Sequence, residues 1–439
     1  MPSNPITNSL QAQPNRRNAC PGLSRMVMAK DGAIARIKLR LGRLSADQAR
    51  SIAAIAERSD AGAIELSIRS NIQLRGIAPE HWDNVVSALH DAGLGAENSG
   101  ADDIRNVMVS PTAGIDRGQI ADVTELASSA LDTLQANEAF YALSPKFSLQ
   151  IDGGEDCAMV SHPGDIWLSA MDRKTYAFGL ASSPDKPALG TIDARHALPF
   201  TEALLHRFLQ QGSFARMKHL FETISPSQFL ADLERELTFP ILSANGWKRK
   251  APTAFSHLGA NRQRDGSTYI GTMPLMGRLT PRQLSALADL SESVKGELRL
   301  TPWQGVILPY VNETRVIDLT QKLRSLGLEM TAEAPHARLR ACSGSSGCAS
   351  ALADTQTDGG KLATRLSPGT SSVHITGCAK SCAALAPLPH TLLARSAGRY
   401  DLYRQEPFPQ DGAGPSRFGR LLATDITIDE AAHFLNARH

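Results

Sequence analysis

Four cysteines are grouped in two short segments of the chain. Cys342 and Cys348 enclose five residues in CSGSSGC, and Cys378 and Cys382 enclose three in GCAKSC. Glycine and serine in the first segment let the backbone wrap closely around a bulky ligand. Zinc knuckles favour about two to four intervening residues, so the wider pair fits structural zinc poorly. Unequal spacings suit an iron–sulfur cubane. We expect a [4Fe–4S] cluster, with structural zinc or buried free thiols as the alternatives.

The other two cysteines, Cys20 and Cys157, are distant in sequence, and we expect ordinary small buried residues there. The chain has 439 residues, of which 42% are apolar and 21% charged, with a formal charge of +2. This length allows roughly two to four domains with real cores. The balanced charge gives no case for nucleic-acid binding but leaves an anionic small molecule open. Grouped thiols in such a chain favour metal binding or catalysis in a reducing, cytoplasmic compartment.

The chain begins with a polar segment, residues 1–19, that is rich in Pro, Asn and Ser. It lacks the apolar core of a signal peptide, and we expect a disordered tail. No uncharged apolar run reaches the length of about 18 residues that would suggest a membrane span.

A sequence repeat separates two halves of the chain. Residues 42–50 read GRLSADQAR and residues 277–285 read GRLTPRQLS. Each copy has a hydroxyl residue followed three positions later by glutamine, which is the capping-box signature of a helix start. Apolar residues then recur at helical spacing in both copies. A repeat of half the chain length indicates two pseudo-equivalent halves rather than a solenoid.

Each predicted helix leads into a strand-like segment, AIELSIRSNIQLRGI in residues 63–77 and GELRLTPWQGVILPY in residues 296–310. With one residue of slip, Arg69 falls opposite Trp303. In the first segment apolar and polar residues alternate from position 64 onward, which predicts one half-buried strand. Its polar face is either solvated or faces a ligand, and the pattern leaves both open. Farther along, residues 204–224 have the periodicity of one amphipathic helix.

These motifs together resemble the sulfite and nitrite reductase superfamily. The resemblance rests on the two half-repeats, the SIRSNIQ segment, the RN motif at Arg105, the PKF motif at Lys146 and the two cysteine pairs. It covers almost the whole chain after residue 19. ACPGLSRMV, ACSGSSGCASALADT and HITGCAKSCA are similar to one branch, the precorrin-3B synthases of aerobic cobalamin biosynthesis.

The resemblance implies an α+β fold with two pseudo-symmetric halves. We expect paired ferredoxin-like half-domains and two α/β domains, the second of which binds the iron–sulfur cluster. The expected boundaries are a tail at 1–19, half-domains at 20–92 and 251–332, a first α/β domain on the substrate side at 93–250, and a cluster domain at 333–439. An internally duplicated chain can complete its own two-fold arrangement, so a monomer is expected.

The implied activity is O2-dependent hydroxylation of precorrin-3A at C-20 with closure of a γ-lactone. By resemblance, Cys342, Cys348, Cys378 and Cys382 hold the cluster. The family also contains a mononuclear non-haem iron, for which His374 and His390 are weak candidates. No strand is followed by G-x-G-x-x-G. Electrons are therefore expected to come from a partner reductase or ferredoxin, with NADH as the ultimate donor.

The resemblance also assigns site residues. Arg69, Arg105 and Lys146 match the basic catalytic residues of the family, and Gln73 and Arg75 join them as expected substrate contacts. The precorrin is expected in the groove between the halves, with Cys382 nearest to it.

One position departs from the family pattern, because Ser148 stands where the reductases have a second lysine. A site that reduces sulfite or nitrite benefits from every cation around the anion. Two other functions are considered. The missing lysine disfavours the first of them, a sirohaem-dependent sulfite or nitrite reductase. The second alternative, a zinc-stabilised binding scaffold, explains the cysteines but not the basic residues.

Overall fold

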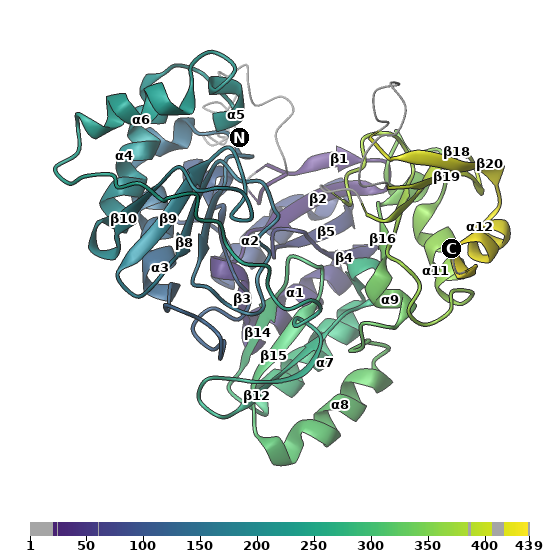
Figure 1. The fold of residues 1–439 in the computed structure, drawn as a ribbon. Coiled ribbons are helices and arrows are strands. Elements are labelled where there is room, and N and C mark those ends of the chain that lie inside the picture. Colours follow the sequence, from purple (N-terminus) through teal and green to yellow (C-terminus); the bar gives the residue numbers. More distant parts are fainter. Residues whose placement is uncertain (1–20, 24, 60, 385–387, 406–416, 438–439) are drawn as a thin grey trace, which may run out of the picture.

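The computed structural model describes residues 21–23, 25–59, 61–384, 388–405 and 417–437. Within these ranges the chain forms four five-stranded sheets, with helices packed around them (Figure 1). The expected tail and Cys20 lie outside the described residues. Among the described helices, none is long and apolar enough to cross a membrane.

Two of the sheets exchange strands between the halves of the chain. The first sheet has the order β1 (Val27–Ala29), β2 (Gly32–Ile37), β5 (Ile72–Ile77), β4 (Ala63–Leu66), β13 (Arg278–Leu279). The second has the order β11 (Gly259–Arg262), β12 (Thr268–Thr272), β15 (Val306–Val311), β14 (Glu297–Leu300), β3 (Arg43–Ser45). Strand β13 of the second half pairs with β4, and β3 of the first half pairs with β14. Each half therefore completes the sheet of the other.

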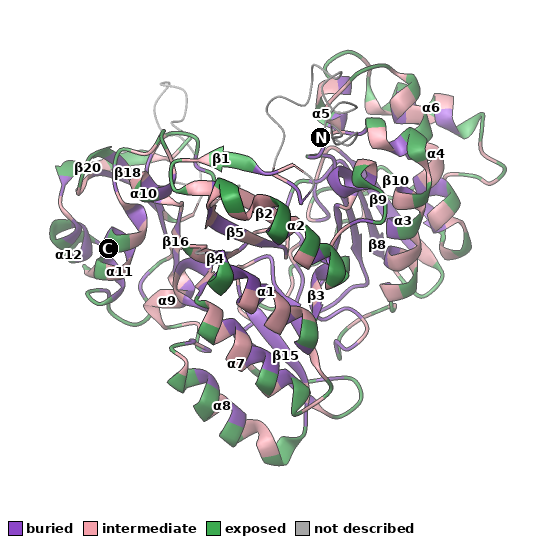
Figure 2. Cartoon of the chain, turned by 180° about the vertical axis from the view of Figure 1, so that it is seen from behind, coloured by how far each residue is buried: buried purple, intermediate pink, exposed green. Residues whose placement is uncertain are grey.

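Both predicted capping boxes are present. Ser45 and Gln48 cap α1 (Ala46–Arg58), and Thr280 and Gln283 cap α7 (Pro281–Glu292). The two helices pack against each other. Together with α2 (Trp82–Asp91) and α8 (Val316–Ser325), they cover one continuous core that draws buried residues from both half-domains. Figure 2 shows β15 and much of the central sheets buried, the outer faces of α1, α7 and α8 exposed or half-buried, and the edge strand β1 exposed.

The other two sheets share one topology. The first contains β6 (Val107–Val109), β7 (Leu149–Asp152), β8 (Ile166–Ala170), β9 (Thr175–Leu180) and β10 (Gly190–Asp193). The second contains β16 (Leu339–Ala341), β17 (Val373–Thr376), β18 (His390–Ser396), β19 (Arg399–Arg404) and β20 (Arg420–Ile426). In chain order, each has two parallel pairings followed by two antiparallel ones. The expected α+β fold with two pseudo-symmetric halves is confirmed.

Helices complete both α/β domains. The first carries α3 (Thr124–Ala136), α4 (Ala197–Gln210), α5 (Met217–Leu220) and α6 (Pro226–Glu234). The second carries α9 (Pro335–Arg338), α10 (Gly344–Gly347), α11 (Thr355–Ala363) and α12 (Ile428–Asn436). Each domain has a hydrophobic core of its own.

The single strand predicted from position 64 onward is wrong, because this segment is a β-hairpin. Strands β4 and β5 are joined by a turn at residues 67–71. The Ser67 hydroxyl accepts hydrogen bonds from the backbone amides of Asn71 (3.1 Å) and Arg69 (3.4 Å), and Ser70 has a left-handed φ of 55°. A turn of five residues preserves the alternation, since Glu65 pairs with Gln73 across the hairpin. The two arrangements therefore look alike in sequence.

The predicted helix over 204–224 is also interrupted. Helix α4 ends at Gln210, and Gly212 follows with a φ of 116°, which favours glycine. The chain then turns back, and the short helix α5 begins at Met217. The apolar periodicity continues because both segments pack into the same core.

Candidate active site

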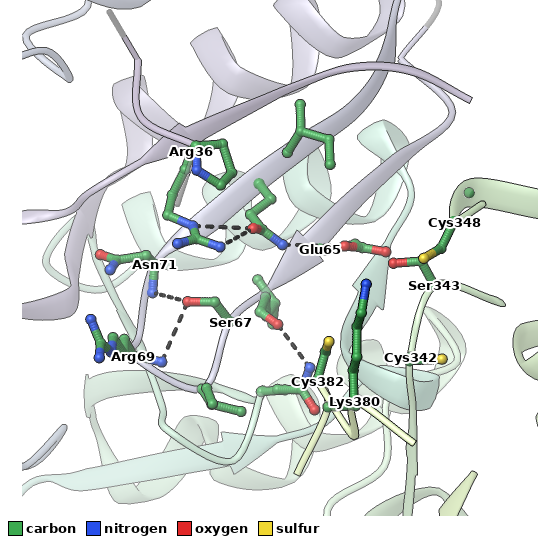
Figure 3. A pocket seen from close by; sticks show the side chains of 18 of the residues that line it. Arg36, Glu65, Ser67, Arg69, Asn71, Cys342, Ser343, Cys348, Lys380 and Cys382 are labelled. Carbon is green, nitrogen blue, oxygen red and sulfur yellow. Dashed lines mark hydrogen bonds between the residues drawn. The ribbon is translucent and has the colours of Figure 1, made fainter. Parts of the chain in front are cut away.

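A cavity of about 1050 Å³ lies over the first sheet, between the two α/β domains. Its floor is formed by β2, β4, β5 and the turn at 67–71. The first α/β domain contributes one wall and the second contributes the other, with all four grouped cysteines on the second. In Figure 3, Cys342 and Cys348 lie on one side of the view, Arg69 and Asn71 on the other, and Cys382 between them. The structure thus brings together residues that are more than 300 positions apart.

A hydrogen-bonded chain crosses the floor. Arg36 donates to the Gln73 side-chain oxygen from both Nε (3.1 Å) and Nη2 (2.5 Å). Gln73 donates onward to Glu65 (3.3 Å), and Glu65 also accepts from Arg278 of the second half (2.7 Å). The polar face of the hairpin therefore lines the cavity as a hydrogen-bonded surface. Sequence reasoning did not single out Arg36, which has no motif of its own.

The Arg75 side chain forms hydrogen bonds with other residues of the protein. Only 6% of its side chain is exposed. It donates to both carboxylate oxygens of Asp31, at 3.1 and 3.0 Å, and to the Gly347 carbonyl at 2.8 Å. Although Arg75 lines the cavity, these bonds make it a link between the first sheet and the cysteine loop. Its expected contact with the substrate stays a prediction.

The remaining predicted cations divide into two groups. Arg69 and Lys146 line the cavity, and Arg69 donates to the Lys146 carbonyl (3.2 Å). Arg105 is not among the lining residues, and its Nη1 donates a hydrogen bond of 3.5 Å to the Leu94 carbonyl. It borders two other spaces, one of about 10 Å³ that it shares with Arg69 and one of about 830 Å³. Ser148, at the position of the missing lysine, is 1% exposed and does not line the cavity.

Parallel strands bring the two cysteine pairs together. Strands β16 and β17 are adjacent and parallel, so their carboxyl ends meet at one edge of the sheet. Cys342 directly follows β16, and Cys378 follows β17 after Gly377. The Gly377 amide donates to the Cys342 sulfur (3.2 Å). A Cβ added at Gly377 would lie 2.5 Å from the Ala351 Cβ, so the close approach of these segments requires glycine.

The thiols suit an iron–sulfur cluster. Cys342, Cys348 and Cys378 are partly exposed and Cys382 is exposed, all toward the same cavity. Burial and the three other cysteines raise the pKa of the Cys382 thiol, which reflects how closely the four groups converge. An NH···S bond such as that from Gly377 stabilises a thiolate bound to a cluster. Cys157 is fully buried elsewhere, and burial raises its thiol pKa to about 12.

The described residues do not define a site for a mononuclear iron. Among them, no group of three or more His, Cys, Asp or Glu side chains, the four cysteines included, is close enough to hold a single metal ion. A cubane cluster spreads its thiolates over four irons, so this finding bears on the mononuclear iron and not on the cluster. His374 is 2% exposed within β17, and neither it nor His390 lines the cavity. Burial lowers the pKa of His374 to about 4. The two candidate histidines are thus parts of the sheet, with no ligand set around them.

Two family models match most of the described chain. The nitrite/sulfite reductase ferredoxin-like half domain matches residues 27–92 and 261–326. The nitrite and sulphite reductase 4Fe-4S domain matches residues 100–241. The chain belongs to the sulfite and nitrite reductase superfamily. The half-domain match occurs once in each half, as the repeat predicted, and the second α/β domain repeats the topology of the matched 4Fe-4S domain. Superfamily membership and the convergent thiols support an iron–sulfur cluster.

Relatives within the superfamily differ in function. A precorrin-3B synthase from Sinorhizobium sp is 27% identical over 396 residues, covering 87% of this chain and 82% of the relative. A ferredoxin–nitrite reductase from Synechococcus elongatus is 28% identical over 382 residues, covering 80% and 73%. Among solved structures, the NirA protein of Mycobacterium tuberculosis has a TM-score of 0.72 and 22% identity, covering 92% of this chain and 79% of that one. The similarity to NirA, at this identity, shows a shared fold.

Proposed function

We propose that the chain is a precorrin-3B synthase, an O2-dependent monooxygenase of cobalamin biosynthesis. It would hydroxylate precorrin-3A at C-20 and allow an acetate side chain to close a γ-lactone. The observation that carries the proposal is the cavity of about 1050 Å³, which places basic side chains across from four cysteines. Small-molecule sites usually enclose about 300–1,000 Å³, so this one suits a ligand as large as a tetrapyrrole.

The charges of the cavity favour a polyanionic ligand. Five lining cations form no ion pair with a carboxylate of the described chain: Lys30, Arg36, Lys146, Lys218, Lys380. Among the residues that the structure describes, two carboxylates line the same space, Glu65 and Asp165. A precorrin carries many carboxylates, and each can accept charge-assisted hydrogen bonds from such groups. Ile34, Leu66 and Ile68 add apolar surface on the floor, where the ring would rest.

The positions of these groups suggest a role for each of them in the proposed reaction. A bound cluster would supply electrons one at a time. Dioxygen gives one oxygen atom to the substrate, and the other leaves as water with two electrons and two protons. The floor chain from Arg36 to Glu65 would orient the macrocycle. Cys382, the exposed cysteine of the four, would lie nearest to it. NADH is proposed as the ultimate electron source, through a partner reductase or ferredoxin.

A second candidate is a sirohaem-dependent nitrite or sulfite reductase. The similarity to the Synechococcus ferredoxin–nitrite reductase favours it. The burial of Ser148 argues against it, because the position of the second lysine offers no group to an anion in the cavity. A sirohaem would also occupy the space that the synthase needs for its substrate.

Metal analysis, an optical spectrum and turnover assays of anaerobically purified protein distinguish the synthase from the reductase. We expect brown protein with iron, acid-labile sulfide and no sirohaem bands, which converts precorrin-3A only when O2 and electrons are supplied. Sirohaem absorption with nitrite or sulfite reduction would instead establish the reductase. Zinc without iron or sulfide would support the scaffold alternative. A Cys382→Ser protein is expected to lose oxygenation, and full turnover in that variant with its cluster retained would overturn the role of Cys382.

A further inference from the structure

A buried histidine faces the cavity from the first α/β domain. His162 lies between β7 and β8, lines the cavity and is 7% exposed. Its Nε2 atom is buried and has no hydrogen-bond partner in the described chain. A buried polar atom without a partner costs free energy unless a ligand or water supplies one. Its presence in a cavity wall therefore points to a ligand group that binds there.

An arginine that lines the same cavity, Arg216, is held in place by a buried carboxylate. Asp165 is 1% exposed and accepts hydrogen bonds from the backbone amides of Ser148 and Met217, both at 2.9 Å. It also accepts from Arg216 Nε at 2.9 and 2.7 Å. This contact uses only the Nε edge of the guanidinium. The two terminal amino groups of Arg216, which lines the cavity, have no hydrogen-bond partner among the described residues.

The electrostatics of the pair suit an anion. Burial, with Arg69 and Arg216 nearby, lowers the pKa of His162 to about 4. The imidazole is therefore neutral at physiological pH and can donate one N–H without adding charge. Arg216 supplies a fixed fork of donors, which matches the geometry of a carboxylate. The exposed Lys218 adds a further cation at the rim of the same wall.

We propose that His162 and Arg216 form a subsite that binds one carboxylate of the macrocycle. This rests on the proposed tetrapyrrole substrate and extends it. The carboxylate accepts hydrogen bonds from the terminal amino groups of Arg216 and from His162 Nε2. Since the subsite belongs to the first α/β domain and the cysteines to the second, it fixes which edge of the ring points away from the cluster. A small inorganic oxyanion such as nitrite offers the same oxygens and is the other source of this chemistry.

Equilibrium binding to the anaerobically purified holoprotein tests the subsite. The probe is uroporphyrin, a stable tetrapyrrole with eight carboxylates, followed by fluorescence quenching. We expect Arg216→Met to weaken binding roughly 10- to 100-fold and His162→Leu roughly tenfold, as for hydrogen bonds to a charged group. The matched control is Arg235→Met, which removes an arginine 72% exposed at the end of α6 and is expected to change affinity less than twofold.

A conservative variant and a second probe distinguish failure of the subsite from failure of the proposed function. Arg216→Lys retains a cation for Asp165 but lacks the two terminal amino groups, so it should fold and still bind uroporphyrin weakly. Unchanged affinity in the Arg216 and His162 variants overturns the subsite but not the proposed function. No uroporphyrin binding by the wild type overturns the proposed function. In that case, calorimetry with nitrite tests the subsite by itself. Weaker nitrite binding by the variants than by the wild type supports His162 and Arg216 as an oxyanion subsite, and equal binding overturns the subsite.

Discussion

Arg75 donates a hydrogen bond of 2.8 Å to the backbone carbonyl of Gly347, a residue 272 positions away in sequence. The same guanidinium is held by Asp31 on the first sheet. One arginine therefore ties the cavity floor to the segment between Cys342 and Cys348. A Cβ at Gly347 would lie 2.7 Å from Arg75 Nη2, so the glycine is what permits this contact.

We expect Arg75→Met to loosen the cysteine loop and to leave Asp31 without its partner. A lost hydrogen bond to a charged group costs about 1.5–3 kcal/mol, so chemical denaturation should show a loss of that order. Iron retained through gel filtration should also fall. Arg36→Met, which removes a floor arginine without a bond to the loop, is the control. Equal iron contents in the two variants would contradict the structural role of Arg75.

Cysteine replacements should separate cluster ligands from the buried thiol. Cys378→Ser is expected to lower iron and acid-labile sulfide severely, because one iron loses its thiolate. Cys157→Ser should leave the iron content unchanged, since Cys157 is fully buried away from the cavity. Iron and sulfide analysis of anaerobically purified protein provides the test. Loss of iron in both variants would mean that the cluster assignment is incomplete.

Arg69 and Arg105 should differ in their effect on the ligand. Arg69 lines the cavity, whereas Arg105 does not. We expect Arg69→Met to weaken uroporphyrin binding roughly 10-fold or more. Arg105→Met should change it less than about threefold. A larger effect at Arg105 would show that this residue reaches the ligand, as the family resemblance implies.

A buried carboxyl pair predicts a pH effect on stability. Burial, then the charge of Asp152, raises the pKa of Glu155 well above its usual range. Glu155 is 0% exposed, and its Oε2 accepts from the Gly153 amide (2.8 Å). The fold therefore favours the protonated form of the Glu155 side chain. Its contribution to stability is complete below the unfolded pKa near 4.3 and is lost as pH rises toward the folded pKa.

Glu155→Gln replaces the carboxyl proton with an amide donor and removes this dependence. In the window between the two pKa values, the wild type should lose about 1.4 kcal/mol of unfolding free energy per pH unit relative to the variant. Urea denaturation at a series of pH values measures the difference. Parallel curves for the two proteins would show that Glu155 is ionised when folded.

Local features of the chain were predictable from its sequence. The capping boxes at Ser45 and Thr280 identify helix starts because a cap depends on residues within one turn. The repeat placed Arg69 opposite Trp303, and both occupy the third position of equivalent five-residue turns. The cysteine spacing pointed to a cluster because a cubane needs one thiolate per iron, which wide and unequal spacings can supply. The missing lysine at Ser148 was visible as a departure from a motif.

Other features needed more than local pattern. The hairpin at residues 67–71 was mistaken for a strand because a five-residue turn without glycine keeps the alternation in phase. The break after Gln210 was hidden because residues on both sides face one core. In each case the periodicity reports which side is buried, and burial alone does not say whether the chain continues or reverses.

The tertiary structure alone decided which charged residues line the cavity. Arg75 proved to be bonded to Asp31 and Gly347, while Arg105 lies outside the cavity. His162 and Arg216 carry no motif, yet both line the cavity. Caps and alternation arise from interactions over a few residues. The cavity arises from the docking of two domains onto a shared sheet, so its lining depends on contacts between residues hundreds of positions apart.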